Sequence, residues 1–239
     1  MIGADFEKIH FELFGLDLVE PMALVTDTVM GALSIYFAYR LKKLNGDHPF
    51  YQYWIWFYLI FGFGSLLGGI GHVMYNYWGF VGKIPSWISG PTSVYFLEQA
   101  MISVHPNRKS FQTLKILSFW KLMLVLIVFT LILSLVDLSD NPSKGFLPVA
   151  INTIVGVSLT AGVLARFYVK KGLTPIYKYF VFGVLVMLPS AFVFLLKINL
   201  HPWFDKNDLS HVLMMAGITY FYIGVKKLYA GGFNKDAYL

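Results

Sequence analysis

The chain has 239 residues, of which 57% are hydrophobic and only 13% are charged. Because a soluble domain carries about 25% charged residues, this composition excludes an ordinary soluble fold and indicates a polytopic membrane protein. The sequence contains no cysteine, which excludes disulfides, thiolate metal ligands and cysteine nucleophiles. The net charge of +6 does not indicate nucleic-acid binding, because the basic residues collect in alternate loops between apolar segments.

A helix needs about 20 apolar residues to cross the hydrocarbon core of a bilayer. Apolar segments bounded by proline and glycine predict an all-α fold, a single domain over residues 1–239 that spans the membrane seven times. An interfacial or re-entrant segment is the alternative for the short third helix. The predicted helices lie at about 20–41, 51–78, 91–105, 114–137, 146–169, 175–197 and 208–229.

The basic residues predict the orientation of these helices. Most of the 19 Lys and Arg residues, including Arg40, Arg108, Lys121 and Arg166, fall on one side of the predicted bundle. Cytoplasmic loops are enriched in Lys and Arg, so we expect the N-terminus outside the cell and the C-terminus in the cytoplasm.

Ionisable residues occur at one predicted depth on several of these helices. Asp27 is about 10 Å below the outer surface on the first helix, His72 is near the outer end of the second, and Asp208 and His211 open the last. Glu98 enters from the same side on the third helix. Ionisable groups in a membrane usually face the bundle interior and mark a metal, substrate or proton site, so we expect these residues to converge.

The spacing of these residues favours a metal site. Asp208 and Asn207 precede His211 by three and four residues, so all three can share one helix face. With His72 as a further ligand, His72, Asp208 and His211 leave a position for water, as in catalytic zinc sites. Asp27 or Glu98 would then orient this water or act as the general base.

Each of these residues also has a structural interpretation. Asp208 can be a cap of the last helix, and His72 can bind a backbone carbonyl group or pair with Asp27. The glycine-rich run over 62–71 predicts close helix packing, or a cavity beside His72.

Three motifs resemble those of the CREST superfamily of seven-helix membrane proteins, which includes alkaline ceramidases and the progestin and adiponectin receptors. They are Thr26-Asp27, Gly68-Gly69-Ile-Gly71-His72 and Asn207-Asp208-Leu-Ser-His211, and they are most similar to those of bacterial seven-helix proteins. The resemblance implies a bacterial inner (plasma) membrane protein, a zinc ion held by three histidines and a water, and hydrolysis of a lipid amide.

The sequence departs from the superfamily at two positions. The family's His-x-x-x-His pattern begins here with Asn207, so only His72 and His211 carry over directly and Asp208 is the candidate replacement. The family serine four residues before the helix-two histidine is replaced by Gly68, and Ser65 lies about two turns before His72.

The sequence leaves several functions open, all with membrane lipids as partners. The first is a zinc-dependent intramembrane hydrolase of a lipid amide or ester. The second, which Asn207 favours, is a lipid-binding or sensor protein without catalysis. A haem protein with His72 and His211 as axial ligands and a proton-coupled transporter are further alternatives.

Overall fold

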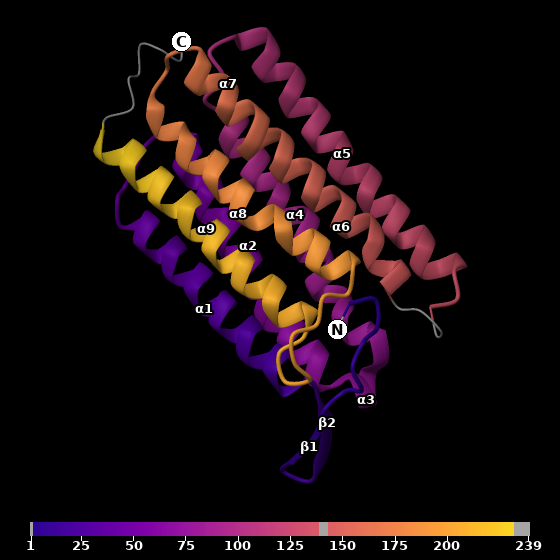
Figure 1. Ribbon diagram of the computed structural model, residues 1–239. Coiled ribbons are helices and arrows are strands. Elements are labelled where there is room, and N and C mark those ends of the chain that lie inside the picture. Colours follow the sequence, from indigo (N-terminus) through magenta and orange to yellow (C-terminus); the bar gives the residue numbers. More distant parts are fainter. Residues whose placement is uncertain (1, 139–142, 232–239) are drawn as a thin grey trace.

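The computed structural model describes residues 2–138 and 143–231, which form an elongated bundle of long helices with a small β-hairpin at one end (Figure 1). We call this the hairpin end. The prediction of an all-α fold is confirmed for the bundle. The elements are β1 (His10–Leu13), β2 (Leu16–Val19), α1 (Pro21–Lys42), α2 (Pro49–Val73), α3 (Tyr75–Trp78), η1 (Gly79–Lys83), α4 (Ile84–Ile102), α5 (Arg108–Leu135), α6 (Ser143–Val157), η2 (Ser158–Leu164), α7 (Ala165–Lys170), η3 (Pro175–Tyr177), α8 (Lys178–Leu195) and α9 (Lys206–Ala230).

Six helical segments in the described part of the chain are long and apolar enough to cross a membrane. They support the assignment of this chain as an integral membrane protein. One of them joins α6, a π-helical stretch (η2) and α7 into a single segment. The segments are Pro21–Lys42, Pro49–Val73, Arg108–Leu135, Lys144–Lys170, Pro175–Leu195 and Lys206–Ala230.

Helix α4 corresponds to the short third helix of the sequence prediction and is not one of these six segments. It packs against α2, α5 and α6, and its second half is almost entirely buried. This position explains its polar residues, because Ser93, Glu98 and Gln99 are covered by protein.

The structure corrects several predicted helix boundaries. Helix α4 begins at Ile84, seven residues before the predicted start, because Pro85 occupies its first turn and Pro91 is accommodated inside the helix. Helix α5 begins at Arg108, because the Asn107 side chain accepts a hydrogen bond from the Ser110 backbone N–H at 2.9 Å and caps the helix. Helix α2 ends at Val73, and α3 and η1 form a separate turn.

The β-hairpin before α1 was not predicted from the sequence. Its strands pair antiparallel from His10 opposite Val19 to Leu13 opposite Leu16. Phe14 and Gly15 form the turn with positive φ angles of 53° and 76°. Because Glu20 follows β2 directly, the hairpin places Glu20 at the entrance to α1.

Glycine residues bring α1 and α2 into close contact. A Cβ atom added at Gly31 would lie 2.8 Å from the Gly62 carbonyl oxygen, and one added at Gly62 would lie 3.0 Å from the Gly31 carbonyl oxygen. Membrane helices use such small residues to approach closely, so this part of the glycine-rich run serves helix packing.

Aromatic side chains fill the half of the bundle away from the hairpin. Trp54 and Phe50 of α2 are fully buried against Phe180 of α8 and Phe221 of α9. The Tyr58 hydroxyl group donates a hydrogen bond to the Ile218 carbonyl oxygen at 2.8 Å, which joins α2 to α9. This packing joins α2, α8 and α9 in that half of the bundle.

Substitution of Gly31 by alanine should destabilise the protein, because the new methyl group meets backbone atoms of α2 and the helices must separate. We expect a loss of about 1–3 kcal/mol, measured by unfolding in mixed detergent micelles. Gly162→Ala is the matched control, since its Cβ would lie 3.6 Å from the Val184 side chain, an ordinary contact. Equal stability of the two variants would contradict the close approach of α1 and α2.

Candidate functional site

A cavity of about 670 Å³ lies in the hairpin-end half of the bundle, lined by residues of α1, α2, α4, α6, α8 and α9. Its deep wall is apolar and includes Phe57, Phe61, Met187 and Phe221. The wall nearer to the hairpin end carries most of the ionisable groups that the sequence singled out. They are Asp27, His72, Asp208 and His211.

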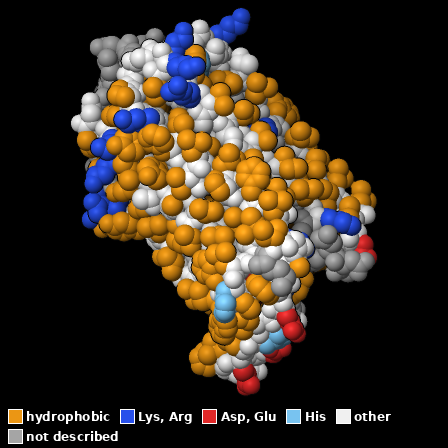
Figure 2. Space-filling view, in the orientation of Figure 1, with side chains coloured by type: hydrophobic (Ala, Val, Ile, Leu, Met, Phe, Trp, Pro, Cys, Tyr) orange, Lys and Arg blue, Asp and Glu red, His pale blue; other side chains and the backbone are white. Residues whose placement is uncertain are grey.

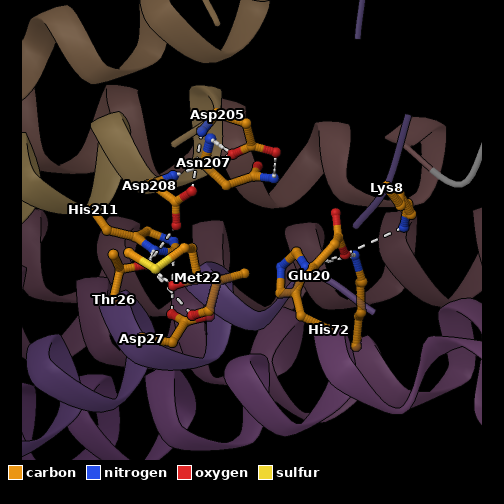
Figure 3. Close-up of polar contacts among 12 residues, drawn as sticks. Lys8, Glu20, Met22, Thr26, Asp27, His72, Asp205, Asn207, Asp208 and His211 are labelled. Carbon is orange, nitrogen blue, oxygen red and sulfur yellow. Dashed lines mark hydrogen bonds and ion pairs between the residues drawn. The ribbon is translucent and has the colours of Figure 1, made fainter. Parts of the chain in front are cut away.

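Thr26 connects α1 to α9 and is buried next to Asp27, Asp208 and His211, which line the polar end of this cavity (Figure 3). Its hydroxyl oxygen lies 2.9 Å from Asp208 Oδ1 and 2.8 Å from His211 Nδ1. On the other side of the same imidazole, His211 Nε2 lies 3.6 Å from Asp27 Oδ1. The structure therefore brings Asp27, Asp208 and His211 together, as expected, with Thr26 at their centre.

The Thr26 hydroxyl group has one proton, which can be directed at His211, at Asp208 or at the Met22 carbonyl oxygen 3.1 Å away, and two of these arrangements decide which nitrogen of His211 is protonated. In the first, Thr26 donates to His211 Nδ1, and the Nε2–H group points toward Asp27. In the second, His211 Nδ1–H donates to Thr26, and Thr26 donates to Asp208. The two arrangements differ in the nitrogen that carries the imidazole proton, so the site can hold a proton at either edge of His211.

Asp27 is nearly buried and faces the cavity. Its side chain is 6% exposed, and in the described part of the chain it makes no hydrogen bond. Gly68 and Gly69 of α2 provide the space for it, because Cβ atoms there would lie 3.4 Å from Asp27 Oδ2 and 3.0 Å from Asp27 Cβ. Part of the glycine-rich run therefore lines the cavity, beside Asp27 and one turn from His72.

His72 belongs to a second polar group at the cavity mouth. Its Nδ1 lies 2.8 Å from Glu20 Oε2 and 3.2 Å from Lys83 Nζ. Lys8 Nζ lies 3.2 Å from the same Glu20 oxygen. Figure 3 shows this group separate from the one around Thr26.

The environment of this second group shifts two pKa values. Burial alone would raise the pKa of Glu20, but the hydrogen bond with His72 and the positive charges of Lys83 and Lys8 hold it well below its usual range. Burial lowers the pKa of Lys83 to about 8, against the opposite effect of Glu20. The mouth of the cavity is thus a tightly coupled set of paired charges.

The three residues expected to hold zinc do not fit a metal site. His72 pairs with Glu20, and the Lys83 ammonium group lies 3.2 Å from its Nδ1, where it would repel a cation. Across residues 2–138 and 143–231, no three His, Asp or Glu side chains are placed to hold one metal ion. The described residues therefore do not support the predicted zinc site of His72, Asp208 and His211.

Asp208 and Asn207 have roles in capping α9. The Asp205 carboxylate accepts hydrogen bonds from the Asn207 and Asp208 backbone N–H groups, and Asp208 Oδ2 accepts one from the Asp205 N–H at 3.0 Å. The Asn207 side-chain amide also donates to Asp205. The capping interpretation of Asp208 is correct in part: Asp205 is the N-cap, and Asp208 completes the capping box while its other oxygen binds Thr26.

Ser65 lines the cavity, but its hydroxyl group donates to the Phe61 carbonyl oxygen at 3.0 Å.

The sequence did not indicate four of the residues at this site, which are Thr26, Glu20, Lys83 and Asp205. The one indication for Thr26 in the sequence was its position next to Asp27 in the motif Thr26-Asp27. The other three residues lie just before the starts of α1, α4 and α9, and they are Glu20, Lys83 and Asp205. Charged residues are common at the ends of membrane helices, so their presence there does not indicate a functional site.

Glu98 lies apart from the cavity. Its carboxylate lies 2.5 Å from Lys121 Nζ and accepts a hydrogen bond from the Ser118 hydroxyl group, both on α5. Lys121 also donates to Asn152 Oδ1 at 2.6 Å. Because α4 begins at Ile84, Glu98 lies about 21 Å along its helix, whereas Asp27 lies about 9 Å along α1.

This arrangement corrects one expectation. Glu98 does not join Asp27, so it is not a general base of the cavity. Lys121, which was counted toward the orientation of the helices, lies within α5 and pairs with Glu98.

Replacement of Lys121 by methionine should destabilise the protein strongly, because Glu98 is then left as an unpaired carboxylate among α4, α5 and α6. We expect a cost of about 3 kcal/mol or more in detergent unfolding. The double variant Glu98→Gln/Lys121→Met should recover most of this loss, because it removes both charges. Additive effects of the two substitutions would show that the ion pair is not formed.

The chain belongs to a family of unknown function, DUF6962, whose model matches residues 22–230. This match covers the bundle from the second residue of α1 to the end of α9, including Thr26, Asp27, His72, Asp208 and His211. No protein of curated function and no solved structure matches the chain.

Proposed function

We propose that this protein binds an amphipathic lipid in the hairpin-end cavity. The observation that carries the proposal is a cavity, inside a bundle of membrane-crossing helices, with an apolar deep wall and ionisable groups at its other end. Its volume of about 670 Å³ lies within the range of about 300–1,000 Å³ found for ligand pockets. An alkyl chain would lie among Phe57, Phe61 and Met187, with its polar end beside Asp27.

The topology proposed with this function has α4 as a seventh membrane-crossing helix and the hairpin end outside the cell. Figure 2 supports this orientation, since Lys and Arg side chains gather at the end away from the hairpin, Asp and Glu gather near the hairpin, and a hydrophobic band separates them. In the plasma membrane of a bacterium, the cavity would then lie at the level of the outer leaflet.

A bulky side chain in the cavity should displace the lipid. Ala191 lines the cavity on α8, so Ala191→Trp should sharply reduce the lipid that co-purifies with the protein, quantified per chain by mass spectrometry after extraction. Leu185→Trp is the matched control, because Leu185 is on the same helix and is 58% exposed on the outer surface of the bundle. If both variants carry as much lipid as the wild type, the cavity is not the binding site.

A second candidate function, hydrolysis of a lipid amide or ester, is favoured by the contacts of Thr26. With its hydroxyl proton directed at His211 Nδ1, the Thr26 oxygen can attack a carbonyl carbon while His211 accepts the proton and Asp27 faces the protonated ring. His211 then returns the proton to the leaving amine or alcohol, and water hydrolyses the acyl-threonine. The resemblance to the CREST superfamily supports a lipid amide as substrate, but no step is assigned to zinc.

Turnover by this route depends on the Thr26 hydroxyl group and the His211 imidazole. Thr26→Val and His211→Gln should each abolish release of fatty acid from a fluorescent lipid amide or ester, whereas Thr26→Ser keeps the hydroxyl group and should retain activity. Full activity of Thr26→Val would exclude the hydroxyl group as nucleophile. Lipid binding without turnover by the wild type would leave the binding function alone.

A further inference from the structure

Asp27 is a buried carboxylate of the cavity that lacks a hydrogen-bond partner in the described part of the chain. Its side chain is 94% buried, and its only polar contact in the described part of the chain is with His211 Nε2 at 3.6 Å, longer than a hydrogen bond. Leaving a buried carboxylate without hydrogen bonds is unfavourable, and more so within a membrane. Since Asp27 faces the cavity, a bound molecule can supply the missing donor.

Among the other carboxylates that line the cavity mouth, Glu7 is exposed, whereas Asp5, Glu20 and Asp205 have partners. Asp5 is paired with Lys206 and, at 2.8 Å, with Lys197. Glu20 is paired with Lys8 and His72. The Asp205 carboxylate accepts hydrogen bonds from backbone N–H groups of α9.

The polar end of the cavity therefore has a deficit of positive charge. Asp27 lies beside the His211 imidazole and Asp208 reaches it through Thr26, and in the described part of the chain neither carboxyl group forms an ion pair with a Lys or Arg side chain. The nearest lysine of the cavity mouth, Lys83, is held by Glu20 and His72 and forms no ion pair with Asp27. An anionic head group would be repelled here, whereas a cation would be attracted.

We propose that the ligand is a cationic amphiphile, a long-chain primary amine whose ammonium group binds Asp27. This inference rests on the proposed lipid-binding function and specifies its ligand class. The ammonium group donates hydrogen bonds to the Asp27 carboxylate and compensates its charge. The alkyl chain extends along the apolar wall formed by Met30, Phe61 and Met187.

The test compares four probes with the same twelve-carbon chain: dodecylamine, dodecyltrimethylammonium, dodecanol and dodecanoate. Binding of each labelled probe to the full-length protein is measured in maltoside micelles, with binding to empty micelles subtracted. Wild type should bind dodecylamine at least about tenfold more tightly than dodecanol, since hydrogen bonds to a charged group are worth about 1.5–3 kcal/mol. Dodecyltrimethylammonium, which has no N–H donor, should bind less tightly than the amine.

Two variants locate the effect. Asp27→Asn should lose the preference for amine over alcohol, whereas Asp5→Asn, which removes a carboxylate already paired with two lysines, should keep it. Dodecanol or dodecanoate binding to wild type as tightly as dodecylamine would overturn the ligand class and leave lipid binding intact. Failure of all four probes to bind would overturn both proposals. The wild-type comparison decides the question even if Asp27→Asn does not fold.

Discussion

Charged and polar groups inside a membrane must find partners within the protein, and this constraint organises the polar residues of the bundle. Glu98 and Lys121 neutralise each other between α4 and α5, and Glu20 is surrounded by Lys8, His72 and Lys83. In the described part of the chain, Asp27 departs from this pattern, because it faces the cavity without a hydrogen bond. The proposed ligand site lies at this side chain.

The two halves of the bundle are packed differently, and this difference confines the cavity. Aromatic side chains around Trp54 fill the half away from the hairpin. Toward the hairpin end, glycines at positions such as Gly68 replace bulky side chains and leave space beside Asp27. Thr26 fixes the polar end of this space, because it joins α1 to the capped first turn of α9.

The sequence predicted the long helices well, because apolar segments of sufficient length leave few alternatives in a membrane. The sequence also predicted correctly that Asp27, Asp208 and His211 lie close together, since each lies within the first two turns of a helix that starts at the same side of the bundle. The predicted depth of Glu98 was wrong, because the prediction depends on the residue at which α4 begins. Pro91 suggested a helix start, but it lies inside α4, which begins at Ile84.

Helix rotation and short-range pairing were beyond prediction from the sequence. The depth of His72 could be estimated, but its partner depends on the hairpin that places Glu20 and on the turn that places Lys83. The described residues do not support the zinc site, because His72 pairs with Glu20 at the start of the first helix and lies 3.2 Å from Lys83 in the turn before α4. Likewise, Asp208 and Asn207 form hydrogen bonds with Asp205 at the N-cap of α9, and residue spacing alone did not predict these contacts.

The most direct test of the central claim is photocrosslinking with a single-chain lipid that carries a diazirine at the end of its alkyl chain, followed by peptide mapping. Lipid bound in the cavity should label its deep wall, at residues such as Phe57, Phe61 and Met187. Labelling confined to the outer surface of the bundle, at residues such as Trp120 and Leu124 of α5, would contradict the account, because these side chains are 64% and 62% exposed.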